Sequence, residues 1–167
     1  MPDSYAQDLA YIHHVGFGGF SRDAGPGLLA ILRQRGVTKG RVVDLGCGSG
    51  IWAERLGRAG YDVVGFDQSS AMIAMTRGRV PEATLHCQSF LDCELPTCDA
   101  VTSLGECLNY RFDGRVGEKS LAQLFRKVHA ALRPGGVFVF DIATPGRGVG
   151  PTMKNFSGDD WAIFINV

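Results

Sequence analysis

Short runs of apolar residues alternate with longer stretches of helical periodicity from residue 41 onward. Each run has the length of a strand, and most are followed by apolar positions that recur every three or four residues. Strands that alternate with helices are typical of βαβ units, which build a doubly wound, mostly parallel sheet with helices on both faces. The pattern therefore predicts an α/β fold with strands at 42–45, 62–66, 84–87, 99–104 and 137–142.

The last of these strands, at 137–142, is a continuous apolar run. Such a run is typical of a strand that is buried on both faces of a parallel sheet. The clearest helix of the chain precedes it, with an apolar face over residues 121–132. We expect Pro134-Gly135-Gly136 to end that helix, because proline cannot continue it.

The first forty residues carry no strand pattern and predict two short helices. Ser4 is a candidate cap for the first, which would run to about His14. A bend rich in glycine would separate it from the second helix, at about Pro26–Gln34. We therefore expect a helical cover at residues 1–36 and a sheet domain at residues 37–167.

The C-terminal part of the chain breaks the alternation. Residues 144–159 are rich in glycine and proline and predict a loop, and 161–165 predict a sixth strand that stops at the chain end. An apolar strand with nothing after it is an exposed edge. It either pairs internally, pairs with another chain to give a homodimer, or belongs to a fragment of a longer protein.

Composition limits the classes of partner. Lys+Arg equals Asp+Glu at 17 each, which argues against a nucleic acid or a membrane surface as the main partner. The five cysteines include no CxxC pair, and no secretory leader or membrane-length apolar segment is present, so we expect a cytoplasmic protein with reduced thiols. A metal site built from Cys93, Cys98 and His86 is an alternative, but we expect no metal.

The segment most informative about chemistry is the turn at 44–50, Asp-Leu-Gly-Cys-Gly-Ser-Gly, where the first strand meets a helix. Residues without Cβ let the backbone approach a ligand, and free amides at a helix N-terminus point toward it. The spacing is G-x-G-x-G, so Ile51 stands where a dinucleotide fingerprint would have its third glycine, and no phosphate-binding lysine follows. Asp67, at the end of the second strand, can accept hydrogen bonds from both hydroxyls of a ribose.

At this point a family resemblance becomes specific. The stretch 42–50 (VVDLGCGSG) resembles the first motif of class I S-adenosylmethionine-dependent methyltransferases, and 64–67 resembles their acidic second-strand end. Residues 99–109 resemble their fourth strand with the segment beneath the reactive methyl, and 132–136 resemble the turn before their fifth strand. The resemblance covers about residues 36–143. It implies a Rossmann-like sheet, here incomplete at the C-terminal antiparallel hairpin because a seventh strand is not found.

The resemblance also implies S-adenosyl-L-methionine as the cofactor and a set of residues that bind it. The glycines of the turn would lie against the methionine portion, Asp44 would orient the turn or the ammonium group, and Asp67 would bind the ribose. Ser89 would contact the adenosine, although the family often has Asp at this position. The full expected set is Asp44, Gly46, Cys47, Gly48, Gly50, Asp67, Gln68, Ser89, Phe90 and Leu104.

Methyl transfer from a sulfonium needs a general base only if the nucleophile must lose a proton. Candidates are Glu106 at the fourth strand's end and, in the segment that this family folds over the cofactor, Tyr11, His13 and His14. The balanced charge favours a small-molecule acceptor. Two alternatives stay open at this stage: a cofactor-binding but inactive fragment of a longer methyltransferase, and an NAD-dependent oxidoreductase.

Overall fold

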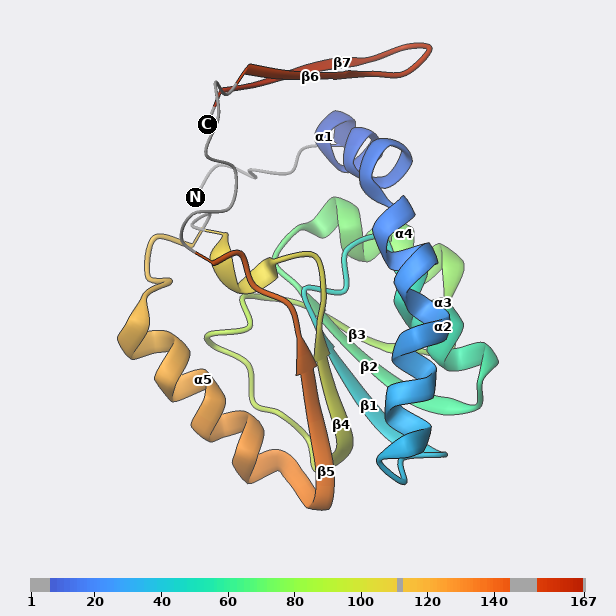
Figure 1. Cartoon of the computed structure of the whole chain (residues 1–167), viewed down its shortest axis with the longest axis vertical. Helices are drawn as coiled ribbons and strands as arrows, with labels where there is room; N and C mark the ends of the chain where they lie inside the picture. The colour runs from blue at the N-terminus through green and yellow to red at the C-terminus, as the bar shows by residue number, and fades with distance from the viewer. Residues whose placement is uncertain (1–6, 111–112, 145–152, 167) are drawn as a thin grey trace.

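A computed structural model describes residues 7–110, 113–144 and 153–166 of the chain. Its centre is a parallel sheet of five strands in the order β3-β2-β1-β4-β5 (Figure 1). The strands are β1 Gly40–Leu45, β2 Tyr61–Asp67, β3 Thr84–Cys87, β4 Cys98–Ser103 and β5 Leu132–Phe140. All five predicted strands and the α/β class are confirmed.

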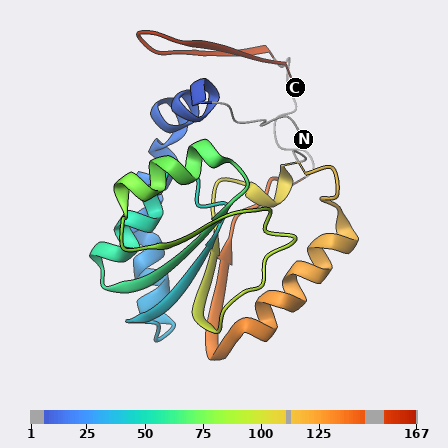
Figure 2. The ribbon, with the colours of Figure 1, turned by 180° about the vertical axis from the view of Figure 1, so that it is seen from behind.

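Helices cover both faces of this sheet. Three lie on one face and α5 on the other, as Figure 2 shows from behind. The helices are α2 Gly19–Gln34, α3 Ile51–Arg58, α4 Ser70–Arg79 and α5 Glu118–Ala131. This is the doubly wound arrangement that the alternation of strands and helices predicts.

Side-chain alternation along the strands divides the core into two layers. Val42 belongs to a buried cluster with residues of α2 and α3, whereas its neighbour Val43 belongs to a second cluster with residues of α5. Successive side chains of a strand point to opposite faces, so one short apolar run fills both layers. Leu56 of α3 and Leu124 of α5 are fully buried on their respective sides.

The strand order sets where a ligand can bind. From β1 the chain moves outward to β2 and β3, then returns to place β4 on the other side of β1. In open α/β sheets, ligands bind at the carboxyl ends of the strands where the order reverses. That point lies between the loops that follow β1 and β4.

The N-terminal helices differ from the prediction. The structure has α1 Gln7–Ile12, a π-helical turn at His13–Phe17 and then α2, which starts well before the expected Pro26. Pro26 lies inside α2, where its missing N–H leaves the Arg22 carbonyl without the usual helical donor. Nη2 of Arg55 donates to that carbonyl at 3.4 Å, which explains why the helix continues through the proline. The expected cap Ser4 lies outside the described residues.

The predicted loop at 144–159 is wrong in its second half. β6 Met153–Ser157 pairs antiparallel with β7 Ala162–Asn166, and this hairpin stands apart from the main sheet (Figure 1). The strand predicted at 161–165 therefore pairs internally. The hairpin packs on the N-terminal helices, because Phe156 lies edge-on against Phe17 at 5.2 Å and Trp161 covers Gly16.

β5 also departs from the prediction. It begins at Leu132, directly after α5, so the Pro-Gly-Gly stretch lies in the strand instead of between helix and strand. Its predicted burial on both faces is wrong, because none of its residues is fully buried and Phe140 is 39% exposed. Among the described strands, none pairs with its outer edge. Phe125 of α5 packs edge-on against Phe138 at 5.7 Å and shields part of one face.

Two glycines of α2 allow a matched test of the packing between α2 and α3. A Cβ on Gly25 would lie 2.3 Å from Nε of Arg55, whereas a Cβ on Gly27 would meet nothing within 4 Å. Gly27→Ala should stabilise the protein by about 0.5–1 kcal/mol, the helical difference between the two residues. Gly25→Ala should be less stable than Gly27→Ala by at least about 1 kcal/mol, because Arg55 must move and release the Arg22 carbonyl. Urea denaturation measures both, and equal stabilisation by the two variants would contradict the contact.

Candidate functional site

The turn after β1 depends on three glycines in the left-handed region. Gly46, Gly48 and Gly50 have φ of 72°, 54° and 78°. The amides of Gly46 and Cys47 both donate to the Phe66 carbonyl, at 2.8 and 3.0 Å, which ties the turn to the end of β2. Residues with a Cβ rarely adopt this conformation, so the glycines are required by the backbone itself.

The space around the three glycines differs. A Cβ on Gly46 would lie 2.5 Å from Sγ of Cys107, and one on Gly50 would lie 2.7 Å from Cγ2 of Thr76. A Cβ on Gly48 would meet nothing within 4 Å. Gly46 and Gly50 therefore pack against the protein, whereas Gly48 presents bare backbone to open space. Such a turn has room for a ligand that lies directly on the backbone, so the residues present fit the expected cofactor.

Asp67 joins this turn to the next helix. Its Oδ2 accepts from the Gly48 amide and its Oδ1 from the Ser69 amide, both at 2.9 Å. Burial raises the pKa of the carboxyl, and the two backbone hydrogen bonds oppose that rise. A carboxylate has about four acceptor positions, so each oxygen keeps one lone pair for a ligand hydroxyl.

Asp44 lies beneath the turn in a buried polar chain. It is 2% exposed and accepts from Oγ1 of Thr102 at 2.7 Å, while Nε1 of Trp52 donates to the same Oγ1 at 3.1 Å. Burial raises the pKa of the Asp44 carboxyl to about 7. The side chain is thus poised between its neutral and charged forms near neutral pH, and a cation placed nearby would favour the charged form.

The N-terminal segment contacts the turn through His14. Nδ1 of His14 lies 2.8 Å from Oγ of Ser49, and its Nε2 lies 3.3 Å from Nη2 of Arg79. An arginine can only donate, so Nε2 accepts and Nδ1 carries the proton. Burial, together with Arg79 and Arg22, lowers the pKa of His14, which agrees with a neutral ring. Arg79 also donates to the Ser49 carbonyl at 3.1 Å, so His14 and Arg79 together hold the turn at Ser49.

The other candidate bases lie in different surroundings. Tyr11 is 45% exposed, and its hydroxyl donates to Oδ1 of Asp160 in the hairpin at 3.4 Å, away from the glycine turn. The nearby Asp160 raises the pKa of Tyr11. Burial lowers the pKa of His13, whose ring lies 5.9 Å from that of Phe17.

Glu106 lies in the turn after β4, beside the glycine turn. It has φ of 58°, the one positive value among the described residues other than glycine. The carboxylate of Asp141 accepts from the amides of Gly105 and Glu106, at 2.8 and 2.9 Å. Cys107 follows, and its thiol donates to the Leu104 carbonyl at 3.0 Å and lies against Gly46. Strained backbone held in this way is typical of functional sites.

The segment after β3 reaches the same edge of the sheet. The Gln88 amide donates to the Asp67 carbonyl at 2.9 Å, and the Ser89 hydroxyl donates to Oδ2 of Asp113 at 2.8 Å. Asp113 is 4% exposed, and hydrogen bonds from Arg115 hold the pKa of its carboxyl well below the usual range. Phe90 packs on the α5 side of the core, whereas Gln68 is exposed.

The structure therefore brings most of the expected residues to one edge of the sheet and leaves Tyr11 with the hairpin. Sequence reasoning missed the polar residues that hold the site from other elements: Thr76, Arg79, Thr102, Asp113 and Asp141. For Asp141 a signal was present, since it directly follows an apolar strand at the carboxyl edge of the sheet.

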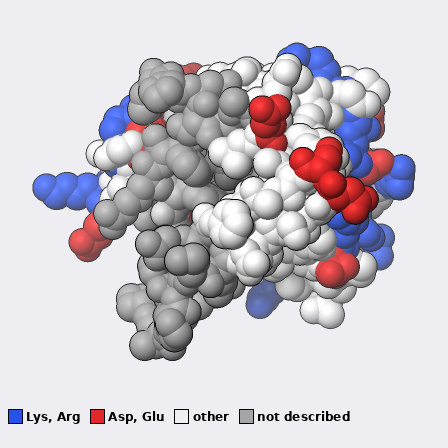
Figure 3. Space-filling model, turned by 90° about the horizontal axis from the view of Figure 1, so that it is seen from above, with Lys and Arg blue, Asp and Glu red and all other residues white. Residues whose placement is uncertain are grey.

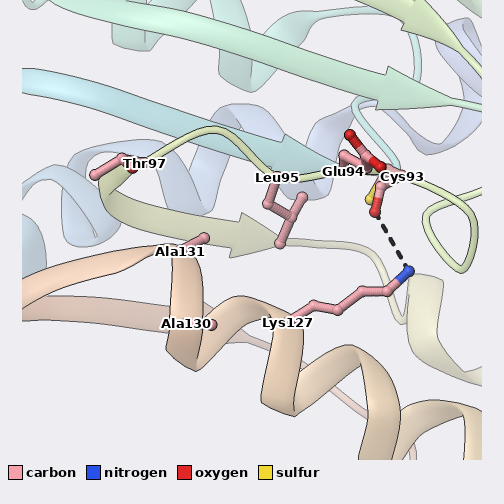
Figure 4. A pocket seen from close by; sticks show the side chains of 7 residues that line it. All are labelled: Cys93, Glu94, Leu95, Thr97, Lys127, Ala130 and Ala131. Carbon is pink, nitrogen blue, oxygen red and sulfur yellow. Dashed lines mark hydrogen bonds between the residues drawn. The ribbon is translucent and has the colours of Figure 1, made fainter.

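A separate cavity of about 280 Å³ lies between α5 and the segment that leads into β4 (Figure 4). Lys127 reaches across it, and its Nζ donates to the carbonyls of Leu91 and Cys93 at 2.7 and 3.3 Å. The cavity borders the amino ends of β4 and β5, so it is not part of the glycine turn. Because the Lys127 ammonium group already donates to these two backbone carbonyls, we assign no chemistry to the cavity.

The surface agrees with the balanced composition. On the face in Figure 3, acidic and basic side chains both reach the surface, and the basic ones lie mainly toward its margins. Among the described residues, no group of three or more His, Cys, Asp or Glu side chains is placed to hold a metal ion. None of the helices in the described ranges is long and apolar enough to span a membrane.

The fold and the site together define a class of protein. A doubly wound parallel sheet, a G-x-G-x-G turn after β1 and an acidic residue at the end of β2 are the features by which the sequence resembles class I methyltransferases. The chain belongs to that family: the family described as "Methyltransferase domain" matches residues 42–136. The resemblance stated from the sequence is thereby confirmed, and the cofactor of the family is S-adenosylmethionine.

Curated relatives support the same family. The ubiquinone biosynthesis O-methyltransferase of Methylobacterium sp. (strain 4-46) is 33% identical over 161 residues, which are 92% of this chain and 53% of that protein. The glycine/sarcosine N-methyltransferase of Halorhodospira halochloris is 31% identical over 117 residues, or 66% of this chain and 41% of that protein. The chain thus spans about half the length of the curated relatives that it matches.

Solved structures agree in fold. CalS10 with S-adenosylmethionine bound, an amino pentose methyltransferase from Micromonospora echinaspora, has a TM-score of 0.71 and 27% identity over 81% of this chain and 57% of that chain. The sugar N-methyltransferase KedS8 from Streptoalloteichus sp ATCC 53650 has a TM-score of 0.75 over 95% of this chain and 63% of that chain. At 23% identity, KedS8 supports the fold alone.

The raised pKa of Asp44 predicts a pH dependence of stability. Between about pH 4 and pH 7 the unfolded chain gives up this proton while the folded chain keeps it, because the pKa rises from 3.8 to about 7 on folding. The contribution of the protonated Asp44 carboxyl to the stability of the fold is complete below about pH 4 and is lost progressively as the pH rises to about 7. The free energy of unfolding should therefore fall with rising pH, relative to Asp44→Asn, by about 1 kcal/mol per pH unit.

Urea denaturation of both proteins at pH 5, 6 and 7 measures this difference. Asparagine can still accept from Thr102, so the variant is a close structural match. Parallel pH profiles for the two proteins would show that Asp44 ionises normally in the folded state.

Proposed function

We propose that this chain binds S-adenosylmethionine across the turn at residues 46–50 and transfers its methyl group to a small-molecule acceptor. The observation that carries the proposal is the bare backbone at Gly48, which faces open space while the Asp67 carboxylate holds its amide. When bound, the cofactor would supply an electrophilic methyl group on a sulfonium. The family match and the cofactor in the CalS10 structure support this choice, and the family match disfavours the oxidoreductase alternative.

The residues around the turn would divide the binding of the cofactor among them. Gly46, Cys47, Gly48 and Gly50 would form the backbone surface for the methionine portion. Asp44 would supply negative charge beneath it, and Asp67 would accept from the ribose hydroxyls. Gln68, Ser89 and Phe90 would border the adenine, and Leu104 would lie near the reacting end. These roles are the ones that the family resemblance implies, and the position of the glycine turn and Asp67 at the carboxyl edge of the sheet supports them.

Of the candidates for a proton acceptor, Glu106 is the one that the surroundings favour. His14 uses both ring nitrogens to hold Ser49 and Arg79, so we assign it a positioning role. Tyr11 lies with Asp160 of the hairpin. Glu106 follows β4 next to the glycine turn, where Asp141 fixes its backbone. Glu106 would therefore orient the acceptor, and it would take a proton where the acceptor has one to lose.

The acceptor is proposed as a small molecule on two grounds. The charge of the chain is balanced, which leaves no strong attraction for a nucleic acid. By their names, three of the relatives above are an O-methyltransferase of ubiquinone biosynthesis, a glycine/sarcosine N-methyltransferase and an amino pentose methyltransferase. The N-terminal helices and the β6–β7 hairpin, which pack on one another above the sheet, would form the acceptor side of the site.

Titration calorimetry with S-adenosylhomocysteine, the product form of the cofactor, tests the proposal directly. We expect binding with micromolar affinity and none for NAD. Asp67→Ala should weaken binding by about 1.5–3 kcal/mol, the range for hydrogen bonds to a charged group. Asp62→Ala is the matched control on the same strand, because Asp62 is exposed and forms an ion pair with Arg41 at the far end of β2.

The outcomes separate the proposals. If S-adenosylhomocysteine does not bind, the proposed function is wrong for this chain. If it binds equally well to Asp67→Ala and to the wild type, the ribose assignment is wrong. Binding without transfer of labelled methyl to any acceptor in a small-molecule screen would favour the alternative of an inactive domain.

We also propose that two copies of the chain can pair through the hairpin. Within the described residues, β6 and β7 pair only with each other, so each keeps one free edge. Phe164 of β7 is 73% exposed, which adds an apolar surface to that edge. Light scattering at high protein concentration should show a dimer that Phe164→Lys weakens. A monomer at all concentrations would contradict this.

A further inference from the structure

We infer that Asp113 is a specificity-determining residue: it fixes the Ser89 hydroxyl as a hydrogen-bond acceptor and so selects a 6-amino purine over a 6-oxo purine. The inference deepens the proposed function and rests on the placement of the cofactor's base beside Ser89. It concerns Asp113, which comes from the segment before α5 and which no motif in the sequence identifies.

A serine hydroxyl is by itself ambiguous, because it can donate its proton to a ligand or accept a proton from one. At Ser89 the ambiguity is removed. Its hydroxyl lies 2.8 Å from Oδ2 of Asp113, and its Oγ accepts from the Leu91 amide at 3.3 Å. An ionised carboxylate can only accept, so the proton of Ser89 points to Asp113. What Ser89 can still offer to a ligand is one lone pair.

Asp113 stays ionised because of its other partner. Arg115 donates through Nε to Oδ1 of Asp113 at 2.8 Å and through Nη2 to Oδ2, and its own amide donates to Oδ1 at 3.1 Å. These bonds hold the pKa of the Asp113 carboxyl far below neutrality. Arg115 is held in turn by Asp92, which accepts from both of its terminal nitrogens at 2.8 and 2.7 Å. The acceptor character of Ser89 is therefore fixed at any pH near 7.

The position of Ser89 connects this pair to the nucleoside. The residue before it, Gln88, donates its amide to the Asp67 carbonyl at 2.9 Å. Asp67 is the proposed ribose ligand, so the base attached to that ribose would extend toward residues 88–90. A 6-amino group would donate to the remaining lone pair of Ser89. A 6-oxo group would place an acceptor against an acceptor and leave both without a partner, which costs affinity.

Calorimetry with a pair of ligands tests the inference without knowledge of the methyl acceptor. The two ligands are S-adenosylhomocysteine and S-inosylhomocysteine, which differ at the 6-position and in the adjacent ring nitrogen. The wild type should bind the adenosine compound at least about tenfold more tightly. In Asp113→Asn, the amide group can donate to Ser89 and free the serine proton for the 6-oxo group. The preference should then fall below about threefold.

Two further variants complete the test. Ser89→Ala should lose the same preference, and it stands in for Asp113→Asn if that variant fails to fold. Asp92→Asn is the matched control, because the Asp92 side chain holds Arg115, whereas Asp92 contacts Ser89 through its backbone amide, which donates to the Ser89 carbonyl at 3.1 Å and which the substitution keeps. This variant should keep the wild-type preference. The two ligands also differ at the ring nitrogen next to the 6-position. That difference affects the wild type and the variants alike, so a change in preference between them reports on Ser89.

The failures are distinguishable. If the wild type binds neither ligand, the proposed cofactor is wrong and this inference falls with it. If the wild type binds the adenosine compound but shows no preference, or if Asp113→Asn or Ser89→Ala keeps the full preference, the inference is overturned and the proposed function stands.

Discussion

The Asp67 carboxylate holds together the parts of the molecule on which the site depends. One oxygen accepts the amide of Gly48 in the turn after β1, and the other accepts the amide of Ser69 at the start of α4. This is geometrically possible because β1 and β2 are parallel neighbours, with Leu45 opposite Phe66, so both strands end at the same level. The bond also requires the left-handed backbone that a glycine at position 48 allows. The turn, the first residues of α4 and the proposed ribose ligand are thus one hydrogen-bonded unit.

The sequence predicts this unit well for a physical reason. The strands are short apolar runs, the turn is a cluster of glycines and the acid lies at a strand end, so each feature is local in the chain. The supporting contacts are not local. Ser89 meets Asp113 across 24 positions, and the Gly105 amide meets Asp141 across 36. Such pairs depend on how α5 and β5 return to the sheet, which no spacing along the chain reveals.

The errors of the sequence-based prediction have similar causes. α2 continues through Pro26 because a side chain from another helix, Arg55, satisfies the carbonyl that the proline leaves open. The strand β6 was missed because Met-Lys-Asn-Phe-Ser has no regular apolar alternation, and β7 supplies the pairing that forms it. The apolar run of β5 predicts a fully buried strand, but β5 is the outer strand of the described sheet. In each case tertiary contacts override a local preference.

The site has two sides of different construction. The proposed cofactor side lies at the ends of β1 and β2, with backbone amides, the buried carboxylate of Asp44 and the partly buried carboxylate of Asp67. The proposed acceptor side would be formed by the strained turn at Glu106, the N-terminal helices and the hairpin that packs on them. The second side is where we expect acceptor specificity to be determined, because it is formed by loops and by elements outside the sheet.

The crystal structure of this chain with S-adenosylhomocysteine tests the central claim most directly. We predict that the methionine portion of the ligand lies on the backbone of residues 46–50, with both ribose hydroxyls within hydrogen-bonding distance of the Asp67 carboxylate. A ligand bound elsewhere, or a ribose that does not contact Asp67, would contradict the account.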